Sequence, residues 1–130
     1  MPKWTPIFLP ADTPQPKGPY SPGVRAGDFV CVSGQTPRDP ITGELLGSDV
    51  ASQTRSTIAN LQRVLEQAGA GLADVVSVTV YLQRSDDWDA MNAAYREVFR
   101  GPYPSRTTVG AELRGILVEI SAVAYKPTTG

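Results

Sequence analysis

Two charged side chains, Arg106 and Glu119, stand in segments whose composition otherwise predicts β-strands. The segment 116–125 is almost wholly apolar or small, so a carboxylate in its middle must be solvated, paired or chemically active. A planar guanidinium can hold a carboxylate through two parallel hydrogen bonds. A carboxylate in apolar surroundings can accept a proton and return it. These two residues are therefore the candidates for an active site.

The sequence contains no histidine and a single cysteine, Cys31. This composition excludes Ser/His/Asp and Cys/His nucleophile arrangements and leaves no zinc site built from nitrogen and sulfur ligands. No GxGxxG or GxxxxGK[ST] phosphate loop is present to bind a nucleotide cofactor. Acid–base chemistry then falls to a carboxylate, Tyr, Lys or water, and we expect neither a metal nor a cofactor.

Length and composition predict one globular domain over residues 1–130, with a proline-rich N-terminal segment at 1–17. A net charge of −1 gives no electrostatic signature of nucleic acid or membrane binding, and we expect neither partner. We find no apolar run long enough for a signal or membrane helix. Since the lone Cys31 cannot form an internal disulfide, the expected location is cytoplasmic.

Two segments have the spacing of amphipathic helices. The first begins after Asp49, a good N-cap, and ends at Gly69. The second begins after a Ser-Asp-Asp cap at 85–87 and ends before Gly101-Pro102. The residues expected on the buried faces are Thr54, Ile58, Leu61, Leu65 and Ala68 in the first helix, and Trp88, Met91, Tyr95, Val98 and Phe99 in the second.

Strands are predicted at 24–25, 29–33, 75–82 and 116–125, with a further strand around Arg106 and at most a short edge strand at 7–9. The segment 36–47 is expected to be a loop or loose hairpin. Alternation within 29–33 puts Phe29, Cys31 and Ser33 on one face and Val30 and Val32 on the other. We expect Cys31 to be a small buried apolar side chain.

This order of elements predicts a two-layer α/β sandwich of the α+β type, with both helices on one face of a mixed sheet. The strands at 75–82 and 116–125 carry apolar residues on both faces. We therefore expect the uncovered face to be buried against another copy of the chain.

A set of short motifs resembles the RidA family of reactive intermediate deaminases. The resemblance runs in register from about residue 16 to residue 124 and so covers nearly the whole chain. The motifs are Gly18-Pro19-Tyr20-Ser21, Val32-Ser33-Gly34-Gln35, Asp39-Pro40-Ile41-Thr42-Gly43, Gln53 with Asn60-Leu61, Ala68-Gly69-Ala70, Val75-Val76, Met91-Asn92 with Tyr95 and Phe99, Pro104-Ser105-Arg106, and Val118-Glu119-Ile120.

The resemblance implies a chorismate-mutase-like fold, assembled as a homotrimer with clefts at the subunit interfaces and no cofactor. It also implies hydrolysis of small 2-imino and 2-enamino acids, such as 2-aminoacrylate and 2-iminobutanoate, to a 2-keto acid and ammonia. By position, Arg106 matches the arginine that holds the substrate carboxylate, and Glu119 matches the acid that positions or activates water. The other matching pocket positions are Tyr20, Ser33, Asn92 and, through its backbone, Gly34.

Two positions depart from the family pattern. Thr108 occupies a substrate-pocket position at which many members have cysteine, which removes thiol chemistry there. Residues 112–115 stand where the family often has an extra proline, so the loop before the last strand is expected to differ.

Each site residue also has a structural interpretation. Arg106 and Glu119 could form a structural ion pair, and Asn92 could be a satisfied core or capping amide. Tyr20 could be a packing residue and Ser33 a side chain bonded to backbone. For the whole chain, the alternatives are a non-catalytic trimer that binds metabolites or shields other proteins, or an endoribonuclease. The acidic charge balance and the absence of histidine argue against the latter.

The sequence allows two placements of the two candidate catalytic residues. A simple hairpin turning near Leu113 and Arg114 would put Arg106 and Glu119 near each other on one face of the sheet. The family fold instead places the last strand between the first two longer strands. It predicts that Arg106 of one subunit meets Glu119 of the next across a cleft.

Overall fold

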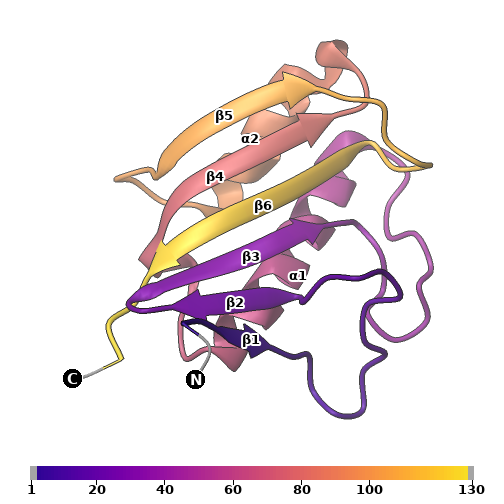
Figure 1. Ribbon diagram of the computed structural model, residues 1–130. Coiled ribbons are helices and arrows are strands. Elements are labelled where there is room, and N and C mark those ends of the chain that lie inside the picture. Colours follow the sequence, from indigo (N-terminus) through magenta and orange to yellow (C-terminus); the bar gives the residue numbers. More distant parts are fainter. Residues whose placement is uncertain (1–2, 129–130) are drawn as a thin grey trace.

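The computed structural model describes residues 3–128, which form one six-stranded sheet with two helices on a single face (Figure 1). Two short 3-10 turns, Leu72–Asp74 and Ser85–Asp87, precede β4 and α2. The main elements in chain order are β1 Thr5–Ile7, β2 Gly23–Ala26, β3 Phe29–Gln35, α1 Val50–Gln67, β4 Val75–Leu82, α2 Trp88–Val98, β5 Ser105–Gly110 and β6 Val118–Tyr125. The predicted two-layer sandwich is confirmed, and the short N-terminal strand begins two residues earlier than expected.

The sheet has the strand order β1-β2-β3-β6-β4-β5. Only β4 and β5 pair in parallel, and the other neighbours are antiparallel, so the sheet is mixed as predicted. The last strand lies between β3 and β4, and the chain passes β4 on its way from β5 to β6 (Figure 1). This order excludes a β5–β6 hairpin and confirms the alternative placement of the last strand.

Helix α1 is the most regular element of the fold. The Asp49 carboxylate accepts a hydrogen bond from the Ser52 backbone N–H at 2.8 Å, and the Ser52 hydroxyl completes a capping box. The helix ends before Gly69, whose φ of +75° suits a residue without a side chain. Ile58 and Leu61 are fully buried against the sheet, so the predicted cap, length and buried face are all confirmed.

Helix α2 departs from its prediction at its first turn. Met91, Tyr95 and Phe99 are buried as expected. Trp88 is 40% exposed, because it starts the helix directly after a 3-10 turn and lies beyond the edge of the core. Asp87 occupies the N-cap position without making a side-chain capping bond.

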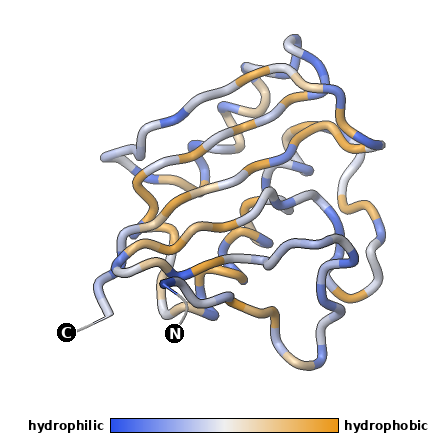
Figure 2. The backbone as a smooth tube through the Cα atoms, viewed as in Figure 1, coloured by the Kyte–Doolittle hydropathy of each residue, from blue (hydrophilic) through white to orange (hydrophobic). Residues whose placement is uncertain are grey.

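The two faces of the sheet are unlike. Side chains of β4 and β6 that point toward the helices are buried, whereas the opposite face, hereafter the open face, has no covering layer (Figures 1 and 2). It exposes several apolar side chains, including Phe29 (46% exposed), Val76, Val109 and Tyr125. Cys31 is exposed and follows Phe29 at alternate spacing in β3, so the expectation of a buried Cys31 is wrong for the single chain. The strand parity was correct, but the core lies on the other face.

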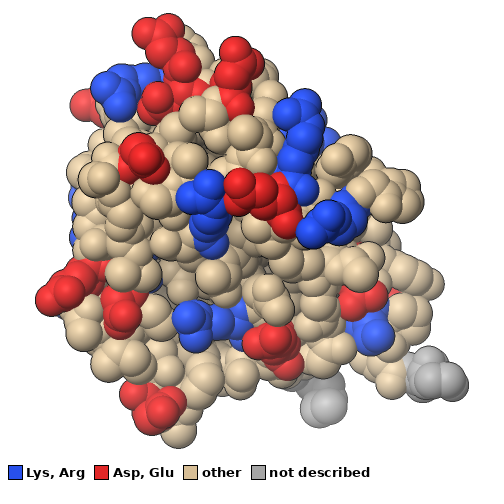
Figure 3. Space-filling view, turned by 180° about the vertical axis from the view of Figure 1, so that it is seen from behind, with Lys and Arg blue, Asp and Glu red and all other residues tan. Residues whose placement is uncertain are grey.

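Lys, Arg, Asp and Glu side chains are scattered over the helix side of the molecule (Figure 3). Arg55 of α1 and Glu97 of α2 form an ion pair of 2.6 Å across the two helices. No helix within residues 3–128 is both long and apolar enough to span a membrane. The helix layer is thus suited to face water, while the open face presents apolar side chains without a partner.

Candidate functional site

Arg106 lies on β5, opposite Val78 of β4, and points to the helix side of the sheet. Its Nη2 donates a hydrogen bond to Asn92 Oδ1 at 2.7 Å. The guanidinium carbon stands 4.8 Å from the centre of the Tyr95 ring, a cation–π arrangement. Helix α2 therefore holds the arginine from two positions that are three residues apart.

A cavity of about 220 Å³ opens beside this arginine. It is lined by Asn92, Tyr95, Arg96, Tyr103, Pro104 and Arg106. No carboxylate lines the cavity, and Asn92 is the one hydrogen-bond partner of the Arg106 guanidinium within residues 3–128. The remaining N–H groups of Arg106 are free for an anionic ligand.

Four buried side-chain oxygens within residues 3–128 have no hydrogen-bond partner, and two of them belong to neighbours of Arg106. One is the hydroxyl of Tyr95, which is 4% exposed, and the other is Oγ1 of Thr108, two residues after Arg106 on the same strand face. Burial raises the pKa of Tyr95, so its hydroxyl keeps its proton at neutral pH. Unsatisfied buried polar groups are rare in folded proteins and often mark functional sites.

Glu119 lies on β6, opposite Tyr81 of β4, and points to the open face. It is half-buried, and burial raises the pKa of its carboxyl above the usual value of 4.5. Within residues 3–128 the carboxylate has neither a salt bridge nor a hydrogen bond. A carboxyl with a raised pKa and no partner is suited to exchange protons with water.

The residues of β3 beside Glu119 shape its surroundings. The pairing of β3 with β6 is irregular between Val32 and Gln35, which is where Ser33 and Gly34 lie. A Cβ on Gly34 would meet the Glu119 carboxylate and would lie 3.0 Å from its Cδ, so only glycine leaves room for this carboxylate. The Ser33 hydroxyl donates to the Ser21 backbone oxygen at 2.6 Å, which matches the structural interpretation of this serine.

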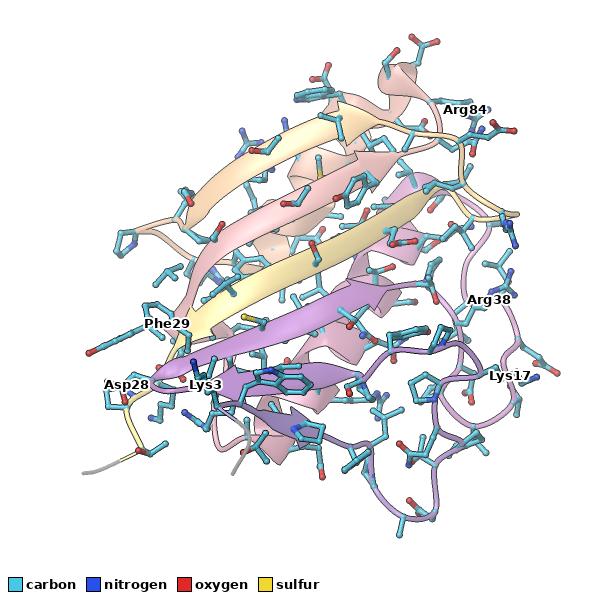
Figure 4. The ribbon with its side chains drawn as sticks, viewed as in Figure 1. Lys3, Lys17, Asp28, Phe29, Arg38 and Arg84 are labelled. Carbon is cyan, nitrogen blue, oxygen red and sulfur yellow. The ribbon has the colours of Figure 1, made fainter. Side chains whose placement is uncertain are left out.

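Tyr20 belongs to the same end of the molecule as Gly34. Its side chain is 59% exposed, and both residues line a second cavity of about 240 Å³. Arg38 also lines this cavity, and Figure 4 shows Arg38 and Lys17 at this end of the sheet. Tyr20 is thus a surface residue of the single chain rather than a packing residue.

The candidate residues form two separate groups. Arg106, Asn92 and Thr108 make up the arginine half, on the helix side of β5 and α2. Tyr20, Ser33, Gly34 and Glu119 make up the glutamate half, on β3, β6 and the loop before β2. Because Arg106 and Glu119 point to opposite faces of one sheet, a structural ion pair between them within the chain is excluded. Residues 3–128 contain no cluster of three potential metal ligands.

Comparisons with known proteins give the chain a family. A family model described as Endoribonuclease L-PSP matches residues 10–126. A RutC family protein of Pyrococcus abyssi is 44% identical over 122 residues, which are 92% of this chain and 96% of the relative. The chain belongs to the RidA (RutC) family.

Other RidA-family proteins agree in sequence and in fold. A Dermatophagoides farinae protein named 2-iminobutanoate/2-iminopropanoate deaminase is 37% identical over 85% of this chain and 88% of its own length. The crystal structure of RidA from the Antarctic bacterium Psychrobacter sp. superposes with a TM-score of 0.85 at 30% identity, covering 93% of this chain and 99% of that one. The RidA-type α+β fold of this chain is therefore shown.

Four residues that line the arginine cavity were not predicted as site residues of this RidA-family chain, namely Tyr95, Arg96, Tyr103 and Pro104. Tyr95 and Pro104 were named in family motifs, and Tyr95 also in the apolar stripe of its helix, whereas Arg96 and Tyr103 were not singled out. The available signal was helical spacing, because Tyr95 and Arg96 follow Asn92 at three and four positions and so share its side of α2. Tyr103 lies in the loop before β5, where sequence spacing does not indicate side-chain direction.

Proposed function

We propose that this chain is a cofactor-independent deaminase that hydrolyses 2-aminoacrylate and 2-iminobutanoate to 2-keto acids and ammonia in the cytoplasm. The observation that carries this proposal is the Arg106 guanidinium, which faces a cavity without any lining carboxylate and leaves most of its N–H groups unpaired. The name of the Dermatophagoides relative supports the same substrate class.

In this proposal, Arg106 binds the substrate carboxylate through two parallel hydrogen bonds and fixes the position of the imine carbon. The Asn92 oxygen orients the guanidinium by accepting its hydrogen bond, and the face of the Tyr95 ring packs against it. Thr108 follows Arg106 on the same face of β5, and its buried hydroxyl has no hydrogen-bond partner within residues 3–128. Such a site acts mainly by orienting a substrate that is already reactive.

Glu119 acts first as the general base and then as the general acid in this reaction. It accepts a proton from water while the water oxygen bonds to the carbon of the protonated imine, which gives a neutral carbinolamine. It then returns the proton to the amine nitrogen, the C–N bond breaks, the hydroxyl proton passes to water, and ammonia leaves a 2-keto acid. An enamine substrate first gains a proton from water at its terminal carbon to become the protonated imine. The raised pKa of Glu119 supports this role, because a more basic carboxylate is the better proton acceptor.

The proposed active site is assembled between subunits of a homotrimer, from Arg106 of one subunit and Glu119 of the next. The opposite orientation of these side chains supports this arrangement, because one chain alone cannot bring them together. The apolar side chains on the open face supply a surface that association would remove from water.

The test is a trapping assay. A threonine dehydratase generates 2-iminobutanoate in the presence of semicarbazide, and added protein competes with the trap by converting the imine to 2-ketobutanoate. We expect the wild type and Arg100→Ala, an exposed arginine outside the arginine cavity, to suppress semicarbazone formation, and Arg106→Ala to fail. Equal suppression by the wild type and Arg106→Ala would contradict the proposal.

The second candidate function is RNA cleavage, which the description of the matching family model names. A net charge of −1 and the absence of histidine weigh against it. RNA cleavage by nuclease-free protein, lost together with Arg106, would favour this candidate. A chain that binds 2-keto acids through Arg106 but leaves the imine trap unaffected would be the non-catalytic alternative.

A further inference from the structure

The arginine cavity contains a second guanidinium group, that of Arg96. Arg96 follows Asn92 by one helical turn, so both side chains leave α2 on the same side. It lines the cavity together with Arg106, and within residues 3–128 it makes neither a hydrogen bond nor an ion pair. Arg96 is exposed and lies in the last turn of α2, and one carboxylate bound at Arg106 would leave its charge without a bound anion.

The lining of the cavity is positively charged and includes polar groups that could bind a ligand. It includes two arginines and no acidic residue. The buried Tyr95 hydroxyl belongs to a residue of the same lining, and because it has no hydrogen-bond partner within residues 3–128, it adds an unsatisfied polar group. The two like charges repel each other in the empty cavity, and a ligand with two negative groups would neutralise both.

We infer that the preferred substrate of this cavity is a 2-imino dicarboxylic acid of four or five carbons. This inference rests on the proposed function. Arg106 takes the carboxylate next to the imine carbon, and Arg96 takes the carboxylate at the far end of the chain. At about 220 Å³ the cavity is smaller than the pockets of roughly 300–1,000 Å³ that hold drug-sized ligands, which suits a metabolite of this length.

The reaction balances without a further reactant. Water adds to the C=N carbon of 2-iminosuccinate, the C–N bond breaks, and the products are oxaloacetate and ammonia. The far carboxylate takes no part in the chemistry, so Arg96 acts on selectivity and Glu119 keeps its role toward water. The reaction that supplies the substrate would be the oxidation of an acidic amino acid to its imine.

The first test measures binding and is independent of turnover. Titration calorimetry compares succinate, an unreactive dicarboxylate, with butyrate for the wild type, Arg96→Gln and Arg100→Gln. Arg100 is the matched control, because it lies on the same stretch of chain, is exposed, and does not line this cavity. We expect Arg96→Gln to bind succinate roughly tenfold more weakly while butyrate binding is unchanged, because one charge-assisted contact is lost. Arg100→Gln should match the wild type.

The second test measures turnover. An L-aspartate oxidase supplies 2-iminosuccinate and a threonine dehydratase supplies 2-iminobutanoate, each with semicarbazide as the trap. We expect the wild type to favour 2-iminosuccinate and Arg96→Gln to lose this preference while it still hydrolyses 2-iminobutanoate. If Arg96→Gln kept the wild-type ratio of activity on 2-iminosuccinate to activity on 2-iminobutanoate, or bound succinate as tightly as the wild type, the dicarboxylate inference would be wrong. The proposed deaminase activity would be unaffected by that result. Failure of the wild type with both imines would instead contradict the proposed deaminase activity.

Discussion

The two halves of the candidate site are held in place by different means. In the arginine half, Arg106 is fixed by a hydrogen bond to Asn92 and by the ring of Tyr95, and it faces a cavity. In the glutamate half, Glu119 has no hydrogen-bond or ion-pair partner within residues 3–128, and its carboxylate occupies the space left by the missing side chain of Gly34.

Under the proposed function, this difference assigns substrate binding to the arginine half and proton transfer to the glutamate half. A guanidinium held by its neighbours presents a fixed pair of donors, which is what recognition of a carboxylate needs. A half-buried carboxyl without a hydrogen bond has a raised pKa, which is what proton transfer near neutral pH needs. Changes in the glutamate half should therefore lower kcat, and changes in the arginine half should raise KM.

The largest effect is expected for Glu119→Gln. The amide cannot accept a proton from water, so we expect kcat to fall by about 10²–10⁴-fold with KM little changed. The thermal unfolding midpoint at pH 7 should be unchanged or higher, because burial opposes the ionised form of this carboxyl. Steady-state kinetics and a thermal melt measure both results. A variant with full kcat would show that Glu119 has no role in the chemistry.

The next effect is expected for Gly34→Ala. The added Cβ would displace the Glu119 carboxylate, and a shift of about 1 Å in a reacting group can cost about 10²-fold in rate. Gly71→Ala is the matched control, because a Cβ there meets nothing within 4 Å. We expect kcat to fall only in Gly34→Ala. Equal rates for the two variants would mean that the position of Glu119 does not matter.

A smaller effect is expected for Asn92→Ala, which removes the bond of 2.7 Å that orients Arg106. We expect KM to rise by about tenfold while kcat stays within a few-fold of the wild type. Asn92→Asp should raise KM further, because the new carboxylate competes with the substrate for the guanidinium. A fall in kcat without a change in KM would contradict the assignment of this half to binding.

The subtlest test is the pH dependence of kcat. Glu119 must be ionised to accept a proton, and burial holds its pKa above 4.5 in the folded chain. Activity should therefore rise with pH through a limb whose midpoint lies above 4.5. This limb should be absent from the residual activity of Glu119→Gln. A midpoint at or below 4.5 would contradict the role given to burial.

The sequence predicted the positions of the helices and strands better than it predicted which face of a strand is buried. The boundaries of β4 and the cap, length and buried face of α1 follow from β-branched composition, Asp49 and helical spacing, which are local properties. The exposure of Cys31 does not follow from a local property. Alternation separates the two faces of a strand without showing which face the helices cover.

The separation of Arg106 and Glu119 likewise depends on neighbouring strands. It follows from the parallel register of β5 on β4 and the antiparallel register of β6 on β4, which no local pattern specifies. The resemblance to the RidA family supplied the strand order and the candidate residues other than Arg106 and Glu119. The cavity, with Tyr95 and Arg96 in its lining, emerged only from the packing of α2 against β5.

The proposed active site takes Arg106 from one subunit and Glu119 from the next. Mixing of Arg106→Ala and Glu119→Gln, each strongly impaired alone, followed by subunit exchange, tests this arrangement directly. If sites form between subunits of a closed ring, random exchange of equal amounts should leave about one quarter of the sites with both residues intact, and activity should return to about one quarter of the wild-type value. If each site were built within one chain, every site would keep one defect. Mixtures that stay inactive after verified exchange would contradict the account.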